Sequence, residues 1–265
     1  MPLSAIQAVF HSGKPAFTPY YTLGFPDYET SLAIIEACVA NGAAMLELGL
    51  PFSDPLADGP TIQHSTHVAL ENGLTTAKCL TAVRELRKRG VQVPLIMFGY
   101  YNPILQYGVA RYVREALAAG ADGFLIPDLP PEEAGELDAL CRELDAGLIY
   151  LVAPTSNSER LALVAQKARG FTYIVSVLGI TGARESVSAQ LGELVARVRA
   201  HIPTPLAVGF GISTPAQAAQ VGHLADGVVI GSQLIKIAQA AHAVGQDPAA
   251  AVGDFVRTVV TAMAA

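Results

Sequence analysis

The fold is decided by a pattern that is complete within residues 123–153, GFLIPDLPPEEAGELDALCRELDAGLIYLVA. Two short apolar runs at the ends of this segment enclose a polar stretch. We predict a helix over 131–145, because Pro131 suits a first helical position and Glu132 and Glu133 then lie in the first turn, where the helix dipole favours acids. The segment therefore predicts a strand, a helix and a second strand.

Apolar runs of this kind recur along the chain, and helix-like stretches separate them. In 75–90, for example, Leu80, Val83 and Leu86 recur at helical spacing. Most runs start 22–34 residues apart, but the second and third start 50 residues apart. The eight runs are FTPYYTL (17–23), AMLELGL (44–50), PLIMFGY (94–100), GFLIPD (123–128), GLIYLVA (147–153), FTYIVSV (171–177), PLAVGFG (205–211) and GVVIGS (227–232).

Eight alternating strands and helices favour the α/β class and a single closed (β/α)8 barrel, or TIM barrel, over residues 1–265. The alternative is an open, doubly wound sheet. No linker divides the chain. The segment 1–12 is interpreted as an extra N-terminal helix that closes the bottom of the barrel.

The composition excludes several classes of protein. Of 265 residues, 51% are hydrophobic, and the net charge of −6 argues against a nucleic-acid partner, which needs a basic face. The cysteines at 38, 79 and 141 lie far apart, which favours neither disulfides nor a metal site. Because no signal peptide and no apolar run of about 18 residues is found, we expect a cytoplasmic protein with no membrane span.

The second run carries a carboxylate where an apolar residue would be expected. Side chains alternate across a strand, so within AMLELGL (44–50) the three leucines share one face, while Met45, Glu47 and Gly49 share the other. The leucines suit the interface between sheet and helices. Glu47 is therefore predicted to point into the barrel, where a charge is costly unless it is paired or its pKa rises. The alternative is a structural Glu that Tyr173 or a backbone amide holds.

Active sites of such barrels lie in the loops after the strands. Two of these loops, 51–63 and 178–190, are long and polar, as is typical of lids or binding loops. Asp54 and Asp58 in the first loop come directly after the strand that carries Glu47. Such an Asp often makes only a turn or a helix cap. Near Glu47, however, a second carboxylate would allow proton transfer at both ends of a substrate.

Glycine-rich loops end the last two strands, in GFGISTP (209–215) and VIGSQ (229–233). In barrels of this kind, backbone N–H groups and a helix N-terminus commonly hold a phosphate at this place. Glycine lets the backbone approach the anion closely. The predicted phosphate site comprises Gly209, Gly211, Gly231 and the hydroxyls of Ser213 and Ser232, with Thr181 and Gly182 closing it.

The lysines and histidines avoid the strand ends. A Schiff-base aldolase needs a lysine inside the barrel, and a metal-dependent lyase needs a cluster of ligands. His64 and His67 lie three apart on a predicted helix and are interpreted as a plain helix face, so no metal site is predicted. Carboxylate acid–base chemistry remains. Carbon–carbon cleavage by this route needs a leaving carbon that accepts electrons once protonated, such as that of an electron-rich aromatic ring.

Four motifs resemble those of the tryptophan synthase α-subunit family, and they occur in the family's order along essentially the whole chain. The first is long and highly specific. The motifs are LELGLPFSDPLADGPTIQ (46–63), FTYIVSVLGITG (171–182), VGFGIST (208–214) and PYYTLGFPD (19–27).

The resemblance implies a lyase that reversibly cleaves indole-3-glycerol phosphate to indole and glyceraldehyde 3-phosphate by a retro-aldol reaction in tryptophan biosynthesis. Glu47 then corresponds to the general acid–base, Asp58 to the carboxylate that binds the indole N–H, and Tyr173 to the tyrosine beside the Glu. The substrate-binding positions implied are Tyr20, Phe98 and Phe210 at the indole, Thr181 in the mobile loop, and Gly182, Gly211, Gly231 and Ser232 at the phosphate.

The resemblance also implies a partner, a pyridoxal-phosphate β subunit that receives indole through a tunnel in an α2β2 heterotetramer. Pro51, Asp54 and Pro55 would lie at that interface, and this chain would bind no cofactor itself. Three alternatives remain open: a stand-alone lyase that releases free indole, another sugar-phosphate barrel enzyme of aromatic amino-acid biosynthesis, and an allosteric activator with little activity. Intact Glu47 and Asp58 argue against the last of these.

Overall fold

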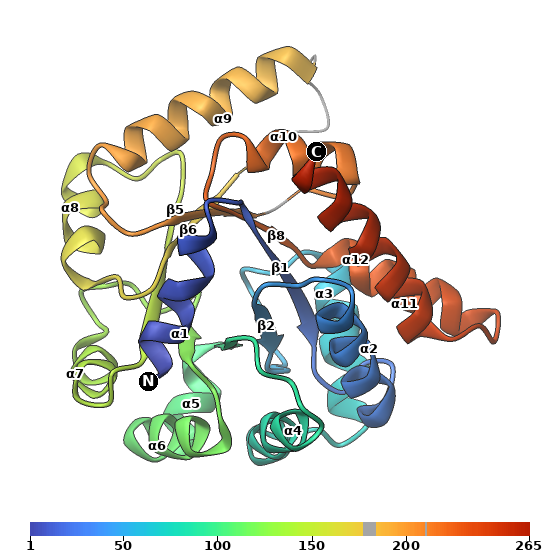
Figure 1. Ribbon diagram of the computed structural model, residues 1–265. Coiled ribbons are helices and arrows are strands. Elements are labelled where there is room, and N and C mark those ends of the chain that lie inside the picture. The colour runs from blue at the N-terminus through green and yellow to red at the C-terminus, as the bar shows by residue number, and fades with distance from the viewer. Residues whose placement is uncertain (177–183, 210) are drawn as a thin grey trace.

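The computed structural model describes residues 1–176, 184–209 and 211–265. Within them, eight parallel strands form a closed barrel in sequential order, which confirms the predicted fold class (Figure 1). The strands are β1 (Ala16–Thr22), β2 (Leu46–Gly49), β3 (Leu95–Phe98), β4 (Gly123–Leu125), β5 (Gly147–Val152), β6 (Thr172–Val175), β7 (Leu206–Gly209) and β8 (Gly227–Ile230).

Helices surround the barrel, and α1 lies across one of its ends (Figure 1). None of the described helices is long and apolar enough to cross a membrane. A short 3-10 helix, Phe10–Ser12, follows α1. The α-helices are α1 (Pro2–Val9), α2 (Tyr28–Ala40), α3 (Pro60–Glu71), α4 (Thr76–Lys88), α5 (Tyr101–Tyr107), α6 (Val109–Ala119), α7 (Gly135–Glu143), α8 (Ser158–Lys167), α9 (Arg184–Arg199), α10 (Pro215–Gly222), α11 (Ser232–Ala243) and α12 (Pro248–Ala264).

The long second unit contains two helices, α3 and α4, between β2 and β3, which accounts for its 50-residue spacing. Local signals start both helices. Pro60 occupies the first turn of α3, and the Thr75 side chain accepts a hydrogen bond from Lys78 N at the start of α4. Leu80, Val83 and Leu86 are buried, as their spacing predicts.

The helix predicted over 131–145 is shorter, because α7 begins only at Gly135. Glu133 N donates to Pro130 O at 3.0 Å, which closes a turn in the segment that was expected to be helical. Lys167 Nζ, on α8, donates to Pro131 O and holds this turn against the neighbouring helix. Acids do occupy the first turn of α7, but they are Glu136 and Asp138.

The strand register determines which side chains enter the barrel. Tyr20 is paired with Glu47 and Glu47 with Ile96, so these three side chains face the same side. Leu46 and Leu48 on the opposite face of β2 are fully buried, under the surrounding helices. The predicted inward direction of Glu47 is thereby confirmed.

Helix α1 closes the N-terminal end of the barrel, as predicted. Leu3 N donates to Asp145 O at 2.9 Å and ties the helix to the barrel rim. Ile6 is fully buried, and its side chain would lie 2.5 Å from a Cβ at Gly147 and 3.1 Å from one at Gly123. The absence of side chains at these glycines makes room for the Ile6 side chain of α1.

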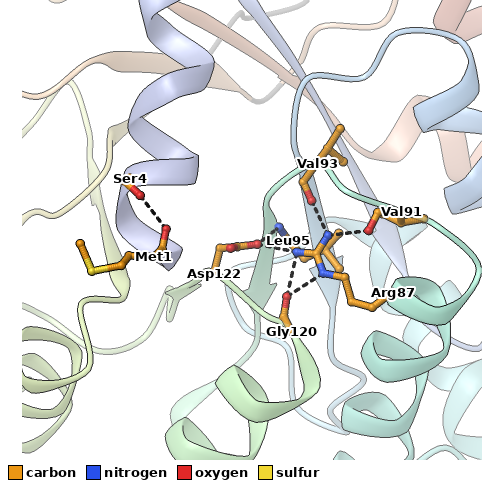
Figure 2. Close-up of polar contacts among 8 residues, drawn as sticks. All are labelled: Met1, Ser4, Arg87, Val91, Val93, Leu95, Gly120 and Asp122. Atoms are coloured by element: carbon orange, nitrogen blue, oxygen red, sulfur yellow. Dashed lines mark hydrogen bonds and ion pairs between the residues drawn. The ribbon is translucent and has the colours of Figure 1, made fainter.

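A polar cluster joins the helices and strands at the same end (Figure 2). Arg87, near the end of α4, donates to Asp122 Oδ2 at 2.6 Å, and the same oxygen accepts from Leu95 N at 2.9 Å. The remaining guanidinium N–H groups donate to backbone carbonyls of Val91, Val93 and Gly120. Because Asp122 precedes β4 and Leu95 begins β3, the cluster fastens two adjacent strands to α4.

Candidate active site

Glu47, the second residue of β2, faces the inside of the barrel. Its side chain is 1% exposed, and no hydrogen-bond donor within the described part of the chain reaches Oε1. Burial without a charged partner disfavours the carboxylate and raises the pKa of Glu47 to about 8. At neutral pH the group therefore exchanges a proton readily, which is the property of a general acid–base.

Asp58 lies above this position, at the end of loop 51–58. Tyr100 Oη donates to Asp58 Oδ2 at 2.9 Å. Burial raises the pKa of Asp58 to about 6, although the hydrogen bond from Tyr100 opposes the rise. Asp58 is therefore largely ionised at neutral pH and can accept a hydrogen bond from a substrate N–H.

Both carboxyl groups act on the same two phenols. Burial, followed by the neighbouring Glu47 and Asp58, raises the pKa of Tyr173 far above its usual value. The pKa of Tyr20 is also raised, first by burial and then by carboxylates that include Asp58 and Glu47. The structure thus brings together four residues that were predicted for the site from distant parts of the sequence.

Aromatic rings form one wall of the site. The rings of Tyr20 and Phe98 meet edge to face, with centroids 5.1 Å apart. Both residues are over nine-tenths buried. A flat, apolar ring can pack against such a wall, and both residues belong to the predicted indole pocket.

Two glycines make room for the phenols. A Cβ at Gly49 would lie 2.2 Å from Tyr20 Oη, and one at Gly209 would lie 1.8 Å from Tyr173 Oη. Any side chain at either position would therefore displace a tyrosine. The hydroxyl of Tyr20, on β1, therefore lies against the adjacent strand β2. The hydroxyl of Tyr173, on β6, lies against the adjacent strand β7.

The predicted phosphate positions gather at the ends of β7 and β8. Gly231 and Ser232 stand at the N-terminus of α11, where the first backbone N–H groups of a helix have no partner within the helix. Gly211 has a φ of +78°, which favours glycine. Ser213 contributes less than expected, because its hydroxyl lies 3.2 Å from Gln217 Oε1 in the cap of α10. Thr181, Gly182 and Phe210 lie outside the described residues.

The residues that were predicted to face a partner lie in loop 51–58, which also carries Asp58. Asp54 is exposed, while Pro51 and Pro55 are half-buried. The adjacent Leu56 is 92% exposed, which is unusual for so large an apolar side chain. A groove of about 320 Å³ runs between this loop and α3.

Tyr100 contacts this site, although no sequence pattern predicted it. In the sequence it is only the last residue of the apolar run PLIMFGY (94–100). In the structure it follows β3 and therefore lies at the C-terminal end of the barrel strands, where the site is. Its place two residues after Phe98 was the available signal. Among the described residues, no group of three or more His, Cys, Asp or Glu side chains forms a possible metal site.

Residues 6–262 match the family profile described as "Tryptophan synthase alpha chain". The chain belongs to this family. Within it, the tryptophan synthase alpha chain of Chloroflexus aggregans is 51% identical over 224 residues, which are 84% of each chain. The alpha chain of Dehalococcoides mccartyi is 46% identical over 237 residues, 89% of this chain and 92% of the relative.

Solved structures of the family have the same fold. Tryptophan synthase subunit alpha from Legionella pneumophila superposes with a TM-score of 0.92 at 36% identity, covering 99% of this chain and 98% of that one. A chain of M. tuberculosis tryptophan synthase in its aminoacrylate-bound form gives 0.87 at 34% identity, covering 98% and 99%. The resemblance inferred from the four motifs is thereby confirmed.

Proposed function

We propose that this chain catalyses the α reaction of tryptophan synthase, the retro-aldol cleavage of indole-3-glycerol phosphate, with Glu47 and Asp58 as its working carboxylates. The observation that carries the proposal is the buried Glu47 carboxyl, which faces the barrel interior with Oε1 unpaired among the described residues. A buried carboxyl oxygen without a hydrogen-bond partner destabilises the fold unless a ligand uses it. Family membership supports the reaction itself.

Glu47 moves the one proton that the reaction transfers. Protonation of indole C3 makes the ring a leaving group, and removal of the proton from the adjacent glycerol hydroxyl turns that carbon into an aldehyde. The bond between C3 and the glycerol carbon breaks, and its electron pair returns to the ring. One carboxyl group with a pKa of about 8 can both donate and accept at these steps.

Asp58 stabilises the charge that develops on the ring. When C3 is protonated, positive charge appears at the indole nitrogen. An ionised carboxylate that accepts a hydrogen bond from the ring N–H stabilises the protonated, positively charged ring more than the neutral ring. Because the charge develops in the transition state, this difference lowers the barrier. Tyr20, Phe98 and Tyr173 pack around the ring and keep water away from it, and Phe210 is proposed for the same pocket.

The phosphate binds at the opposite side of the site. Gly231 and Ser232 supply backbone N–H groups at the N-terminus of α11, where the helix dipole favours an anion, and Gly211 supplies another from the loop after β7. Thr181 and Gly182 are proposed for the same site. The reaction proposed needs no cofactor in this chain.

The proposed partner is a tryptophan synthase β subunit in an α2β2 complex. Pro51, Asp54 and Pro55 would contact it, and the exposed Leu56 beside them supports an interface at this loop.

We also propose that residues 1–265 form one domain, which the closed barrel supports. A cytoplasmic location is proposed because all three cysteines are free and buried.

The deciding experiment measures indole release from indole-3-glycerol phosphate, with and without an added β subunit. We expect slow release by the isolated chain and a large increase with the partner. Full turnover that the β subunit does not change would instead identify a stand-alone lyase. No release in either arm would exclude the proposed reaction, provided that circular dichroism shows the chain to be folded.

A further inference from the structure

We infer that Tyr100 is a positioning residue for the reaction: its hydroxyl clamps the end of loop 51–58 and aims the Asp58 carboxylate at the ring N–H of the substrate. The inference rests on the role proposed for Asp58. It extends that role to a residue that does not itself take part in the chemistry.

The Tyr100 hydroxyl makes two hydrogen bonds to adjacent residues of the loop. It donates to Asp58 Oδ2 at 2.9 Å and accepts from the backbone N–H of Ala57 at 3.0 Å. Within the described residues, Tyr100 is the one hydrogen-bond donor to this carboxylate. The contact leaves Oδ1 to accept the substrate N–H.

Tyr100 is held more firmly than the loop that it clamps. It is 4% exposed, and it lies two residues after β3, at the N-cap of α5. The backbone before it is tied into the barrel, because Gly99 N donates to Leu125 O at 3.1 Å. The two hydrogen bonds from Tyr100 therefore fix the position of Asp58 relative to β3, the strand that also carries Phe98.

Other contacts fix the backbone of Asp58 but leave its side chain free to turn. Asp58 N donates to Pro55 O at 3.0 Å, and Gln63 Nε2 donates to Asp58 O at 2.9 Å. The Phe52 ring packs against the Tyr100 ring with centroids 5.5 Å apart. The carboxylate itself depends on the phenol, so removal of one hydroxyl should release it while the loop stays in place.

The phenol also sets the charge of the carboxylate. Burial, together with the adjacent Asp58, raises the pKa of Tyr100, so the phenol stays protonated and acts as a donor. Its hydrogen bond favours the ionised form of Asp58 and lowers the pKa that burial raises. Loss of the hydroxyl therefore raises the pKa of Asp58, and Asp58 is then ionised only at higher pH.

The test measures the affinity of 3-(indol-3-yl)propyl phosphate against pH. This probe keeps the ring and the phosphate but has no hydroxyl for Glu47 to deprotonate. Glu47→Gln serves as the background, so that Glu47 does not titrate in the measurement. The titration of the probe's own phosphate is the same for every variant and cancels in comparisons between them.

Adding Tyr100→Phe to this background should weaken binding about tenfold at pH 6.5 and less than about twofold at pH 8.5, since a hydrogen bond to a charged group is lost where that group must be ionised. The midpoint of the pH dependence should rise by about one and a half pH units, because a rise of this size reduces the ionised fraction of Asp58 about tenfold at pH 6.5 and very little at pH 8.5. Replacement of Tyr100 by 3,5-difluorotyrosine, a stronger donor in the same space, should lower the midpoint. The second measurement remains decisive if the Phe variant does not fold.

Two controls separate the possible failures. Tyr28→Phe removes another phenol that donates to a carboxylate, Glu85 Oε2, at 3.0 Å, and it should leave the midpoint unchanged. Asp58→Asn should abolish the pH-dependent step. If Asp58→Asn abolishes the step but neither Tyr100 change moves it, the inference about Tyr100 is wrong. If the step survives Asp58→Asn, the role proposed for Asp58 is wrong, and the inference built on it falls too.

Discussion

Buried charge is treated differently at the two ends of the barrel. At the N-terminal end, the side chains of Arg87 and Asp122 are 22% and 13% exposed, and the guanidinium donates to a carboxylate and to three backbone carbonyls (Figure 2). At the C-terminal end, Glu47 is buried more deeply, at 1% exposure, yet no described residue donates to Oε1.

The difference lies in the partners more than in the burial. Burial raises the pKa of Asp122, but the Leu95 N–H and the Arg87 guanidinium oppose that rise. Burial raises the pKa of Glu47 to about 8, and no contact from the described residues opposes that rise. A polar group with its partners in place stabilises the fold, whereas one without them remains available for chemistry.

The largest expected effect concerns Glu47. Glu47→Gln should lower kcat/KM by about a thousandfold or more, because one group both donates and accepts the proton. The fold and phosphate binding should persist, since the amide fills the same space without a charge. Steady-state indole release and inorganic phosphate binding would measure both. Activity within about tenfold of the wild type would remove Glu47 from the mechanism.

The matching change at the other end should affect stability and leave catalysis intact. Arg87→Met should lower the free energy of unfolding by about 3 kcal/mol, because Asp122 and several backbone carbonyls lose their partner. Arg111→Met, at the exposed pair with Glu115, should leave the free energy of unfolding unchanged within the error of the measurement, because solvent screens that pair. Urea unfolding would measure both. A large loss of kcat/KM in folded Arg87→Met protein would contradict the division between the two ends.

The dependence of stability on pH should also distinguish the ends. The pKa of Glu47 is about 8 in the folded chain against 4.5 for an ordinary Glu, so the unfolded chain releases this proton first. The stabilisation from this group is complete below the lower value and falls as pH rises toward 8. Between pH 5.5 and 7, Glu47→Gln should therefore gain about 2 kcal/mol relative to wild type. Urea unfolding of both proteins would measure this gain. If the difference in the free energy of unfolding between Glu47→Gln and wild type is the same at pH 5.5 and pH 7, the pKa of Glu47 is not raised.

The smallest expected effect concerns Asp58. Asp58→Asn should reduce kcat/KM by about tenfold to thirtyfold, since the amide still contacts the ring but carries no charge to stabilise it. Affinity for inorganic phosphate should change little. Asp254→Asn, at an exposed ion pair on α12, provides a control with the same chemical change. If Asp58→Asn instead prevents folding, the side chain is structural.

Several parts of the site could be predicted because their cause is local. The direction of Glu47 follows from the two-residue period of a strand and from the leucines beside it. The glycine loops and the helix start at Ser232 are also read from adjacent residues. The start of α7 was missed because the turn at Pro131 is held by Lys167, 36 residues away in the chain.

The sequence by itself determined the alternation of strands and helices, the face of β2 that carries Glu47, and the end of the barrel where the chemistry lies. Only the tertiary structure decided which polar groups find a partner. Tyr100 meets Asp58 across 42 residues and Arg87 meets Asp122 across 35, and the pairing of β3 with β2 and with β4 brings the two pairs together. Periodicity records how one segment faces its surroundings, but whether a buried charge is satisfied depends on what the closed barrel places opposite it.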